Sequence, residues 1–223
     1  MRMDATDTGA GLGADWARVW VAAAARTVAA RREELIRLDR EIGDGDHGEN
    51  LDRGFAAALA KVEALDGSAG PAEVLKTVAT ALISSVGGAS GPLYGTAFLR
   101  GATAVKDRER LSAADLSAFL AAARDGIVDR GRAQPGDKTM VDAWTPAAQA
   151  AERALAEGAD ARGLLRACAQ AAAEGAQATE PLIARKGRAS YLGERAIGHR
   201  DPGAQSSAYL LAAAAEAAEG AAG

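Results

Sequence analysis

The sequence predicts an all-α fold, an antiparallel bundle or barrel of seven or eight helices. Apolar residues recur at helical spacing along most of the chain, and no segment shows the alternation of apolar and polar residues that marks a strand. Alanine supplies much of the hydrophobic content of 48%, and Ala-rich segments favour closely packed helices. Breaks with glycine or proline leave short connections, which favour antiparallel neighbours.

Four helices are expected in the first half of the chain. The first covers residues 15–39, where apolar side chains repeat at i, i+3, i+4 and i+7: Trp16, Val19, Trp20 and Ala23. Glycines between residues 43 and 48 interrupt it, and a second helix follows from residue 47 or 48 to 65. The third begins at Pro71, a favoured first helical residue, and ends near residues 86–88. The fourth starts at residue 89 or 90, with Ser90 available as its N-cap.

The second half predicts three more helices and a final one. Ser112 is an N-cap candidate with Asp115 at a capping-box offset, and this helix reaches residue 129 or 130. Residues 131–138 form a loop, and a sixth helix runs from residue 138 or 139 to 157. Asp160 caps a seventh helix that ends near residue 178, and residues 180–184 form a short helical turn. Pro202 opens the last helix, which ends near residue 218. We expect one domain over residues 1–223, with flexible ends at 1–12 and 219–223.

Composition excludes several classes of protein. The net charge of −4 and pI of about 5.3 argue against a nucleic-acid-binding surface, which needs a basic stripe. The single cysteine, Cys168, allows no internal disulfide and predicts a small buried thiol. No apolar run approaches the ~18 residues of a membrane span, and residues 1–15 lack the pattern of a signal peptide. A cytoplasmic protein is expected.

The most informative segment is residues 38–48, LDREIGDGDHG. Its three aspartates, Asp39, Asp44 and Asp46, lie within eight residues, and clustered carboxylates repel one another unless a cation lies between them. The glycines allow a tight turn that points several oxygens inward, and oxygen ligands suit Mg²⁺. The segment therefore predicts a divalent metal site, the alternative being a solvated acidic turn between two helices.

Standard motifs do not account for this chemistry. Counted from Asp44, the fifth and sixth positions of an EF-hand hold Gly48 and Glu49 rather than Asp or Asn and glycine. Residues 43–48 match G-x-G-x-x-G, yet they follow a helical pattern and carry two aspartates that would repel a pyrophosphate. Residues 131–139 resemble a Walker A loop, but Asp137 separates the glycine from the lysine and no strand precedes them.

Two further glycine-rich loops are candidates for phosphate binding beside the acidic segment. Residues 87–95 and residues 198–203 each precede a predicted helix. Free N–H groups and the helix dipole make such a helix start a natural phosphate seat. The alternative for each loop is ordinary capping, with Asp201 as the cap of the last helix. Together the three loops favour a metal–phosphate site without a parallel sheet.

These segments resemble the L-subunit family of dihydroxyacetone kinases. The resemblance is carried, in the same order, by LDREIGDGDHG (38–48), GGASGPLYGT (87–96), GDKTM (136–140), RKGRASYLGER (185–195) and GHRDPG (198–203), and it runs from about residue 38 to 211. It implies an all-α barrel of eight antiparallel helices with a nucleotide site at one end.

The resemblance also implies roles for particular residues. Asp39, Asp44 and Asp46 would hold two Mg²⁺ ions. The nucleotide, ADP or ATP, would be bordered by His47, Asn50, Ala89, Ser90, Gly131, Met140, Arg188, Asp201, Pro202 and Gly203. A thioether such as Met140 packs well on a flat ring, and Arg188 can supply charge-assisted hydrogen bonds. No covalent nucleophile is assigned to His47 or His199, and Lys138 and Lys186 are left as either phosphate contacts or solvated charges.

The expected activity is phosphoryl transfer, which depends mainly on positioning and charge neutralisation. The resemblance implies an M-type phosphohistidine protein of the phosphotransferase system as donor, and dihydroxyacetone on a separate K subunit as acceptor. We expect no second domain for the acceptor in this chain, which should then need that partner. Two alternatives remain: an ATP-exchanging kinase subunit for a related short-chain ketose, and a non-catalytic regulatory module. The oligomeric state is left open, a homodimer included.

Overall fold

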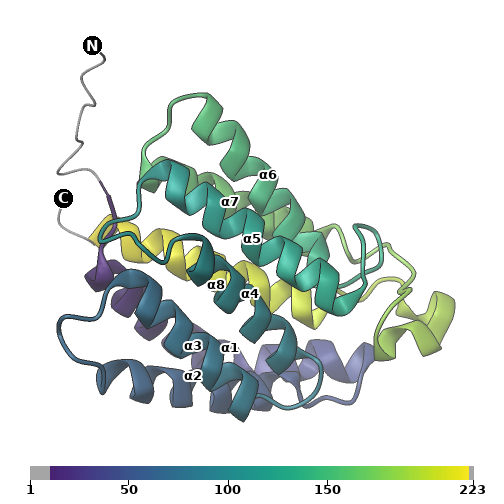
Figure 1. Cartoon of the computed structure of the whole chain (residues 1–223). Helices are drawn as coiled ribbons and strands as arrows, with labels where there is room; N and C mark the ends of the chain where they lie inside the picture. The colour runs from purple at the N-terminus through teal and green to yellow at the C-terminus, as the bar shows by residue number, and fades with distance from the viewer. Residues whose placement is uncertain (1–10, 221–223) are drawn as a thin grey trace.

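The computed structural model describes residues 11–220 of the chain (Figure 1). Within this range the chain forms eight α-helices and one 3₁₀ helix, η1. The helices are α1 (Ala14–Ile42), α2 (His47–Glu63), α3 (Pro71–Ser85), α4 (Ser90–Ala104), α5 (Ala113–Gly131), α6 (Val141–Ala156), α7 (Ala161–Gln177), η1 (Arg188–Ala196) and α8 (Pro202–Gly220). The only β-type pairing among the described residues is an isolated bridge between Leu12 and Leu111. The predicted all-α fold is confirmed.

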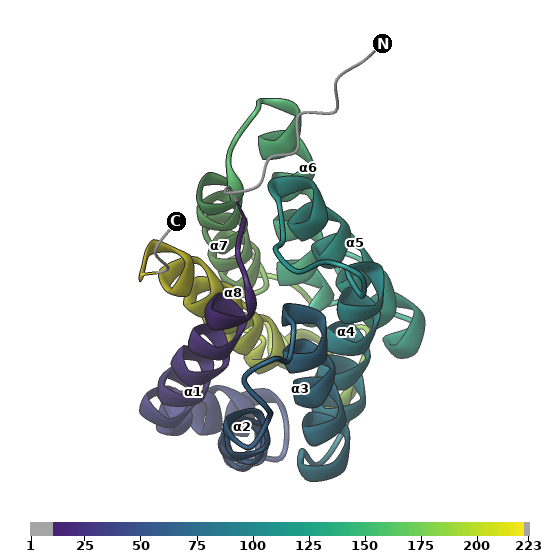
Figure 2. The same cartoon turned by 60° about the vertical axis from the view of Figure 1, so that its left-hand side comes forward.

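The eight α-helices form a closed ring. Each packs against the next along the chain, and α8 packs against α1, which closes the barrel; the turned view in Figure 2 shows α8 between α7 and α1. Because neighbours are antiparallel, alternate connections lie at the same end. The connections α1–α2, α3–α4, α5–α6 and α7–α8 therefore share one end of the barrel, which we call the mouth.

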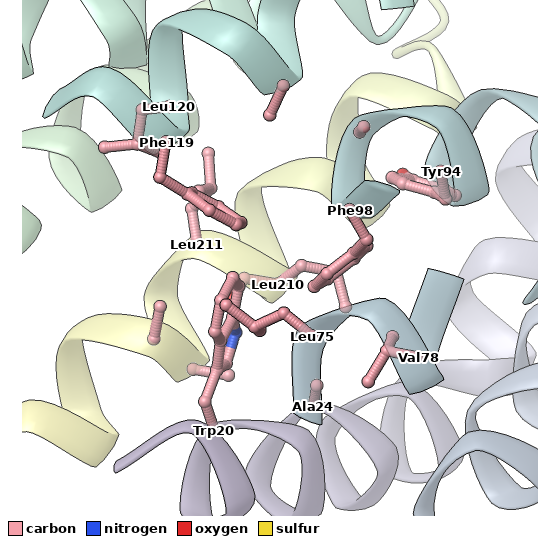
Figure 3. Packing of buried hydrophobic residues seen from close by; sticks show 14 of the residues in the cluster. Trp20, Ala24, Leu75, Val78, Tyr94, Phe98, Phe119, Leu120, Leu210 and Leu211 are labelled. Carbon is pink, nitrogen blue, oxygen red and sulfur yellow. The ribbon is translucent and has the colours of Figure 1, made fainter. Parts of the chain in front are cut away.

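The core is centred on α8, most of whose residues are buried. The indole of Trp16 donates a hydrogen bond to the Ala214 carbonyl at 3.0 Å, and that of Trp20 donates to the Leu210 carbonyl at 2.8 Å. The Trp20 ring also packs on Phe98 and Phe119, with centroids 5.3 and 5.9 Å away (Figure 3). These aromatic contacts lock α1 against α4, α5 and α8, because large rings dominate core packing.

Helix boundaries agree with the sequence except near the mouth. The sixth helix begins at Val141 rather than at residue 138 or 139. Lys138 has a φ of +62°, which no right-handed helix accommodates. The Asp142 carboxylate instead accepts hydrogen bonds from the Gly136 and Thr139 N–H groups, at 2.5 and 2.8 Å, and shapes residues 136–139 into a turn.

The connection between α7 and α8 also differs from expectation. The helical turn predicted at residues 180–184 lies earlier, over residues 178–181, and the sequence pattern missed η1 altogether. Gly187 and Gly193 both have positive φ, at +67° and +57°, and they interrupt any regular periodicity in this segment.

The ends of the chain are only partly described. The predicted flexible residues 1–10 and 221–223 lie outside the described range. Leu12 is buried and exchanges two backbone hydrogen bonds with Leu111, at 2.9 and 2.8 Å. At the other end α8 continues through Glu219, whose carboxylate pairs with Arg166 at 2.7 Å. Residues 12 and 219 therefore both contact the barrel.

Two expectations from composition hold. Cys168 is fully buried, and burial raises the pKa of its thiol to about 12, as suits an inert core residue. None of the helices within residues 11–220 has the length and apolar character needed to cross a membrane.

Candidate metal and nucleotide site

A cavity of about 370 Å³ opens at the mouth of the barrel, within the usual size of small-ligand sites. It collects residues from all four mouth connections. The predicted site residues that line it are Asp39, Asp44, Asp46, His47, Asn50, Ala89, Ser90, Met140, Arg188, Asp201, Pro202 and Gly203. Gly131 does not line it; a Cβ at this position would lie 3.2 Å from Leu93, which does. Gly131 therefore lies next to a residue of the cavity wall but not in the wall itself.

The three aspartates of the acidic segment converge. One ligand oxygen from each of Asp39, Asp44 and Asp46 lies within 4.8 Å of the others, with Asp39 buried and the other two exposed. Asp39 belongs to the last turns of α1. Its carboxylate accepts hydrogen bonds from the Asp46 and His47 N–H groups, at 2.9 and 3.1 Å, and so binds the start of α2. One side chain thus joins two helices and the acidic turn.

Two glycines make this turn possible. A Cβ at position 43 would lie 2.1 Å from the Asp39 carboxylate oxygen, so only glycine leaves room for that carboxylate. Gly45 has a φ of +77°, in the left-handed region that glycine adopts without cost. The residues between the aspartates therefore set the direction of all three side chains.

The acidic cluster has the properties of a cation site. Burial raises the pKa of Asp39; the His47 and Asp46 N–H groups oppose this, while the charges of Asp44 and Asp46 add to it. Such repulsion disfavours the ionised cluster until a cation offsets it. The donor set consists of carboxylate oxygens open to the cavity, which suits a hard ion such as Mg²⁺ that retains water or phosphate ligands.

Ser90 does not cap α4, contrary to the sequence prediction. The start of this helix has no side-chain cap. The Ser90 hydroxyl instead contacts Nδ1 of His47 at 3.1 Å, and Nε2 of His47 contacts the Ser206 hydroxyl at 2.9 Å. Tyr94 and Ser207 extend this chain of buried polar groups into the barrel.

Burial also lowers the pKa of His47 to about 4. The ring is therefore neutral at pH 7, and both of its nitrogens are occupied by hydroxyl groups. This arrangement suits a fixed hydrogen-bonding partner at the cavity wall rather than a proton-transferring base.

Three α-helices have their first residue in the cavity wall. These are α2, α4 and α8, and residues at each helix start line the wall. Asp201 caps α8 as predicted, because its carboxylate accepts a hydrogen bond from the Ala204 N–H at 2.7 Å. Three positive helix ends facing one cavity favour an anion such as phosphate.

Further polar groups border the same space. Arg188 of η1 pairs with Asp44 at 3.0 Å. The Asn50 side-chain oxygen accepts a hydrogen bond from the Arg53 guanidinium at 2.6 Å, and Gly87 lies close against Asn50, since a Cβ there would come within 2.9 Å of the same oxygen. His199 faces Glu41 at 3.8 Å and does not line the cavity.

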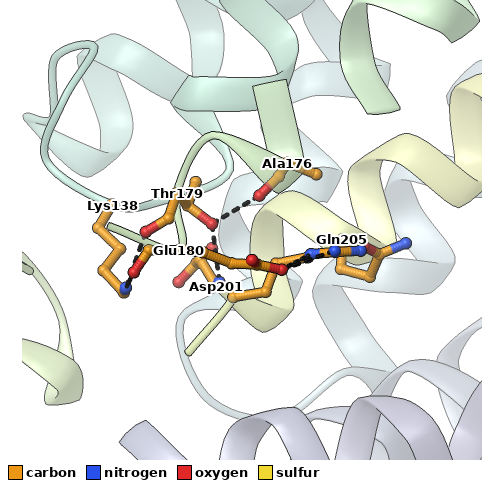
Figure 4. A network of polar contacts seen from close by, with 7 residues as sticks. Lys138, Ala176, Thr179, Glu180, Asp201 and Gln205 are labelled. Atoms are coloured by element: carbon orange, nitrogen blue, oxygen red, sulfur yellow. Dashed lines mark hydrogen bonds and ion pairs between the residues drawn. The ribbon is translucent and has the colours of Figure 1, made fainter. Parts of the chain in front are cut away.

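Lys138 and Lys186, the two lysines that sequence reasoning could not assign, both line the cavity, and Lys138 is buried. It is 1% exposed, and its ammonium lies among backbone carbonyls of the α7–α8 connection, with Thr179, Glu180 and Asp201 close by (Figure 4). It is therefore not a solvated surface charge. Apart from the GDKTM motif itself, nothing in the sequence predicts the positive φ or the burial of Lys138.

Residues 41–216 match the DAK2 domain family. The chain is 43% identical to the PEP-dependent dihydroxyacetone kinase, ADP-binding subunit DhaL, of Escherichia coli, over 86% of this chain and 91% of that protein. It is 44% identical to the corresponding subunit of kinase 1 from Listeria innocua, over 88% and 93% of the two chains. A D-erythrulose kinase of Mycolicibacterium smegmatis is 38% identical, over 82% of this chain and 32% of that protein.

Solved structures of a dihydroxyacetone kinase from C. freundii have a similar fold. The native form has a TM-score of 0.63 at 25% identity and is matched over 90% of this chain and 34% of the kinase chain. A complex of that kinase with AMP-PNP and Mg²⁺ has a TM-score of 0.65 at 24% identity, over 97% and 36%. The chain thus spans about a third of those solved kinase chains. It belongs to the DAK2 domain family, together with the ADP-binding L subunits of dihydroxyacetone kinase.

Proposed function

We propose that this chain is the nucleotide-binding subunit of a dihydroxyacetone kinase. In this proposal ADP or ATP, held with two Mg²⁺ ions at the barrel mouth, carries a phosphoryl group from a phosphotransferase-system phosphohistidine protein to dihydroxyacetone on a K subunit. The observation that carries the proposal is the convergence of three carboxylates and three helix starts on one cavity. Identity above 40% to two subunits named as ADP-binding supports the choice of nucleotide.

The residues of the cavity have complementary tasks in this proposal. Asp39, Asp44 and Asp46 would hold the metal, and bound Mg²⁺ would supply charge neutralisation at the phosphate oxygens. The starts of α4 and α8, near Ser90 and Gly203, offer N–H groups to phosphate. Arg188 pairs with Asp44 of the acidic cluster and adds a positive charge there.

The wall also suits the rest of a nucleotide. Met140 is mostly buried at the start of α6 and lines the cavity, so its flexible thioether can pack on a base. Both ring nitrogens of His47 have hydroxyl partners, Ser90 and Ser206, so His47 holds Ser90 in place rather than binding the metal. These groups bind and orient; none of them needs to act as a covalent nucleophile.

A partner chain is required because the donor and acceptor are carried elsewhere. The segment next to the cavity presents three exposed apolar side chains, Ile183, Tyr191 and Ile197, of which Tyr191 is 86% exposed. Tyr191 also lines a hollow of about 270 Å³ that shares Ile42, Gly43 and Arg188 with the main cavity. This supports docking of the partner over the mouth.

The nucleotide released from purified protein tests the proposal. The protein is purified without added nucleotide, dialysed with Mg²⁺ and denatured, and the released nucleotide is measured. A stoichiometric amount of ADP supports the relay from a phosphohistidine donor. An empty site that binds ATP weakly and exchanges it favours the alternative, an ATP-exchanging kinase subunit for a related short-chain ketose. The similarity to a D-erythrulose kinase is consistent with such a substrate.

A regulatory module without catalysis is distinguished by Asp44→Ala. In a mixture reconstituted with donor and K subunit, this variant should lose kinase activity, because it removes one metal ligand. Activity that survived the substitution would contradict the assignment of the metal site.

A further inference from the structure

The connection between α7 and α8 forms a lobe at the mouth, residues 179–200, which contains η1. Its own apolar packing is small. The buried cluster beneath it consists of Ala184, Ala189 and Ala196 from the lobe and Ile42 from α1, with Leu192 partly buried against them. Since three of these side chains are single methyl groups, the lobe needs polar contacts to stay in place.

One buried ammonium supplies four of those contacts. Nζ of Lys138 donates to the carbonyls of Thr179 and Ala196, both at 2.8 Å, and approaches those of Leu182 and Glu180 at 3.1 and 3.3 Å. An ammonium has three N–H donors, so four carbonyls saturate it. The acceptors come from the beginning and the end of the lobe, and Lys138 therefore joins the two.

The backbone conformation and the burial of Lys138 independently indicate that this residue is held in place. Lys138 has a φ of +62°, a conformation that is costly for a residue with a long side chain. Its side chain is also 1% exposed, although lysine is rarely fully buried. Nearby carboxylates, Asp201, Glu180 and Asp142, compensate its charge. Such strain and burial persist only where the surroundings hold the residue firmly.

The lobe in turn carries groups of the cavity wall. In the sequence, Arg188 lies between the residues whose carbonyls bind Lys138. Its side chain pairs with Asp44 at 3.0 Å. The Arg185 N–H donates to the Asp137 carbonyl at 3.0 Å, and the Asp201 N–H donates to the Thr179 hydroxyl at 2.9 Å. A lobe released from Lys138 would therefore move Arg188 relative to Asp44.

We propose that Lys138 is a positioning residue that holds the lobe, and through it Arg188, against the nucleotide pocket. Lys138 borders the nucleotide pocket, but its ammonium acts on the lobe, because its donors are occupied by lobe carbonyls. Lys138 thus sets affinity and turnover without contacting the reacting atoms. The inference rests on the proposed function for the identity of the ligand, whereas the holding of the lobe is a property of the protein alone.

Hydrogen–deuterium exchange of the nucleotide-free protein tests the holding role. Lys138→Met keeps the length of the side chain and removes the ammonium, and Lys138→Arg restores a positive charge and N–H donors. Lys76→Met, an exposed lysine on α3, is the matched control. We expect amides of residues 183–197 in the Met variant to exchange about tenfold faster or more, with helices α2 to α5 unchanged. The Arg variant should recover part of the protection, and the control should match the original protein.

Calorimetric titration with ADP and Mg²⁺ links the lobe to the pocket. Affinity of the Met variant should fall about 10–100-fold, as for groups that orient a ligand through another side chain. Unchanged exchange in residues 183–197, or faster exchange in all helices or loss of the fold, would overturn the proposal. If the original protein bound no ADP, the proposed function would fail while the exchange comparison still decided the role of Lys138.

Discussion

Asp201 combines a helix cap with a buried charge at the start of α8. Burial raises the pKa of its carboxyl from 3.8 to about 7. The charge of Asp142 also raises this pKa, whereas the hydrogen bond from the Ala204 N–H and the charge of Lys138 oppose the rise. A carboxyl with a higher pKa in the folded state holds its proton more tightly there. Its contribution to stability is therefore complete below pH 3.8 and is lost as the pH rises to about 7.

Asp201→Asn should stabilise the nucleotide-free protein at alkaline pH. Asparagine keeps an oxygen for the cap and removes the buried charge, so we expect the free energy of unfolding at pH 8 to rise by about 2–4 kcal/mol. The gain should vanish below about pH 3, under the unfolded pKa of 3.8, where aspartate is protonated in both states. Urea unfolding at several pH values measures this. Asp160→Asn is the control, because Asp160 caps α7 through the Gly163 N–H at 2.7 Å but is exposed; equal gains in both variants would contradict the role of burial.

Asp44 gives a second prediction, on metal binding. With ADP present, Mg²⁺ should stabilise the original protein by about 2–3 kcal/mol at a hundredfold excess over its dissociation constant. The Asp44→Asn variant should lose most of this stabilisation by Mg²⁺, because one charged ligand is removed from the cluster. Thermal unfolding with increasing Mg²⁺ gives the measurement. Glu219→Gln removes a carboxylate that is also paired with an arginine, but at the far end of α8, and should keep the full Mg²⁺ response.

Individual residues differ in how far the sequence reveals them. The convergence of Asp39, Asp44 and Asp46 was predictable, because short spacing in the chain brings carboxylates together whatever the surrounding fold. Lys138 was not, because its partners lie more than forty positions away. Ser90 was misassigned as a cap, since its actual partner, His47, reaches it only after α2 and α4 pack.

At the scale of elements, α5 begins with a capping box. The Ser112 hydroxyl accepts from the Asp115 N–H at 3.2 Å, and the Asp115 carboxylate accepts from the Ser112 N–H at 3.0 Å. Both bonds are local, which explains why the sequence predicted them correctly.

Ser112→Ala should therefore lower the free energy of unfolding by about 1 kcal/mol, a fall in melting temperature of about 2–4 °C for a chain of this size. Affinity for ADP with Mg²⁺ should not change, because this connection lies at the end of the barrel opposite the mouth. Thr103→Ala removes an exposed hydroxyl on α4 and should cost less than about 0.5 kcal/mol. A weaker affinity in the Ser112 variant would show that the two ends of the barrel are coupled.

Regular helices were predictable to within a few residues, and the lobe was not. Amphipathic periodicity marks a helix that packs on one face, and Pro71, Asp160 and Pro202 mark helix starts. The lobe has no such periodicity, because its small apolar cluster and its carbonyls are satisfied by other elements. Its structure is decided by tertiary contacts, which a single sequence does not display.

The whole molecule explains why the site draws on distant segments. An antiparallel ring of eight helices brings every second connection to the same end, so the first, third, fifth and seventh connections meet at the mouth. The glycine-rich loops, although far apart in the sequence, therefore all lie in the cavity wall. Ring closure between α1 and α8 was predictable from the family resemblance, whereas the periodicity alone allowed an open bundle as well.

The exposed apolar side chain at the mouth leads to a prediction about assembly. Tyr191 is 86% exposed beside the shared wall of both hollows, and a large aromatic side chain at an interface often contributes much of the binding energy. Under the proposed function, Tyr191→Ser should raise the K-subunit concentration for half-maximal rate by about tenfold or more, while affinity for ADP stays unchanged. Val19→Ser is the control, because Val19 is 47% exposed and lies about 30 Å from Asp39 along α1. Titration of the K subunit in a reconstituted phosphorylation assay measures both, and an equal response of the two variants would mean that the partner docks away from the lobe.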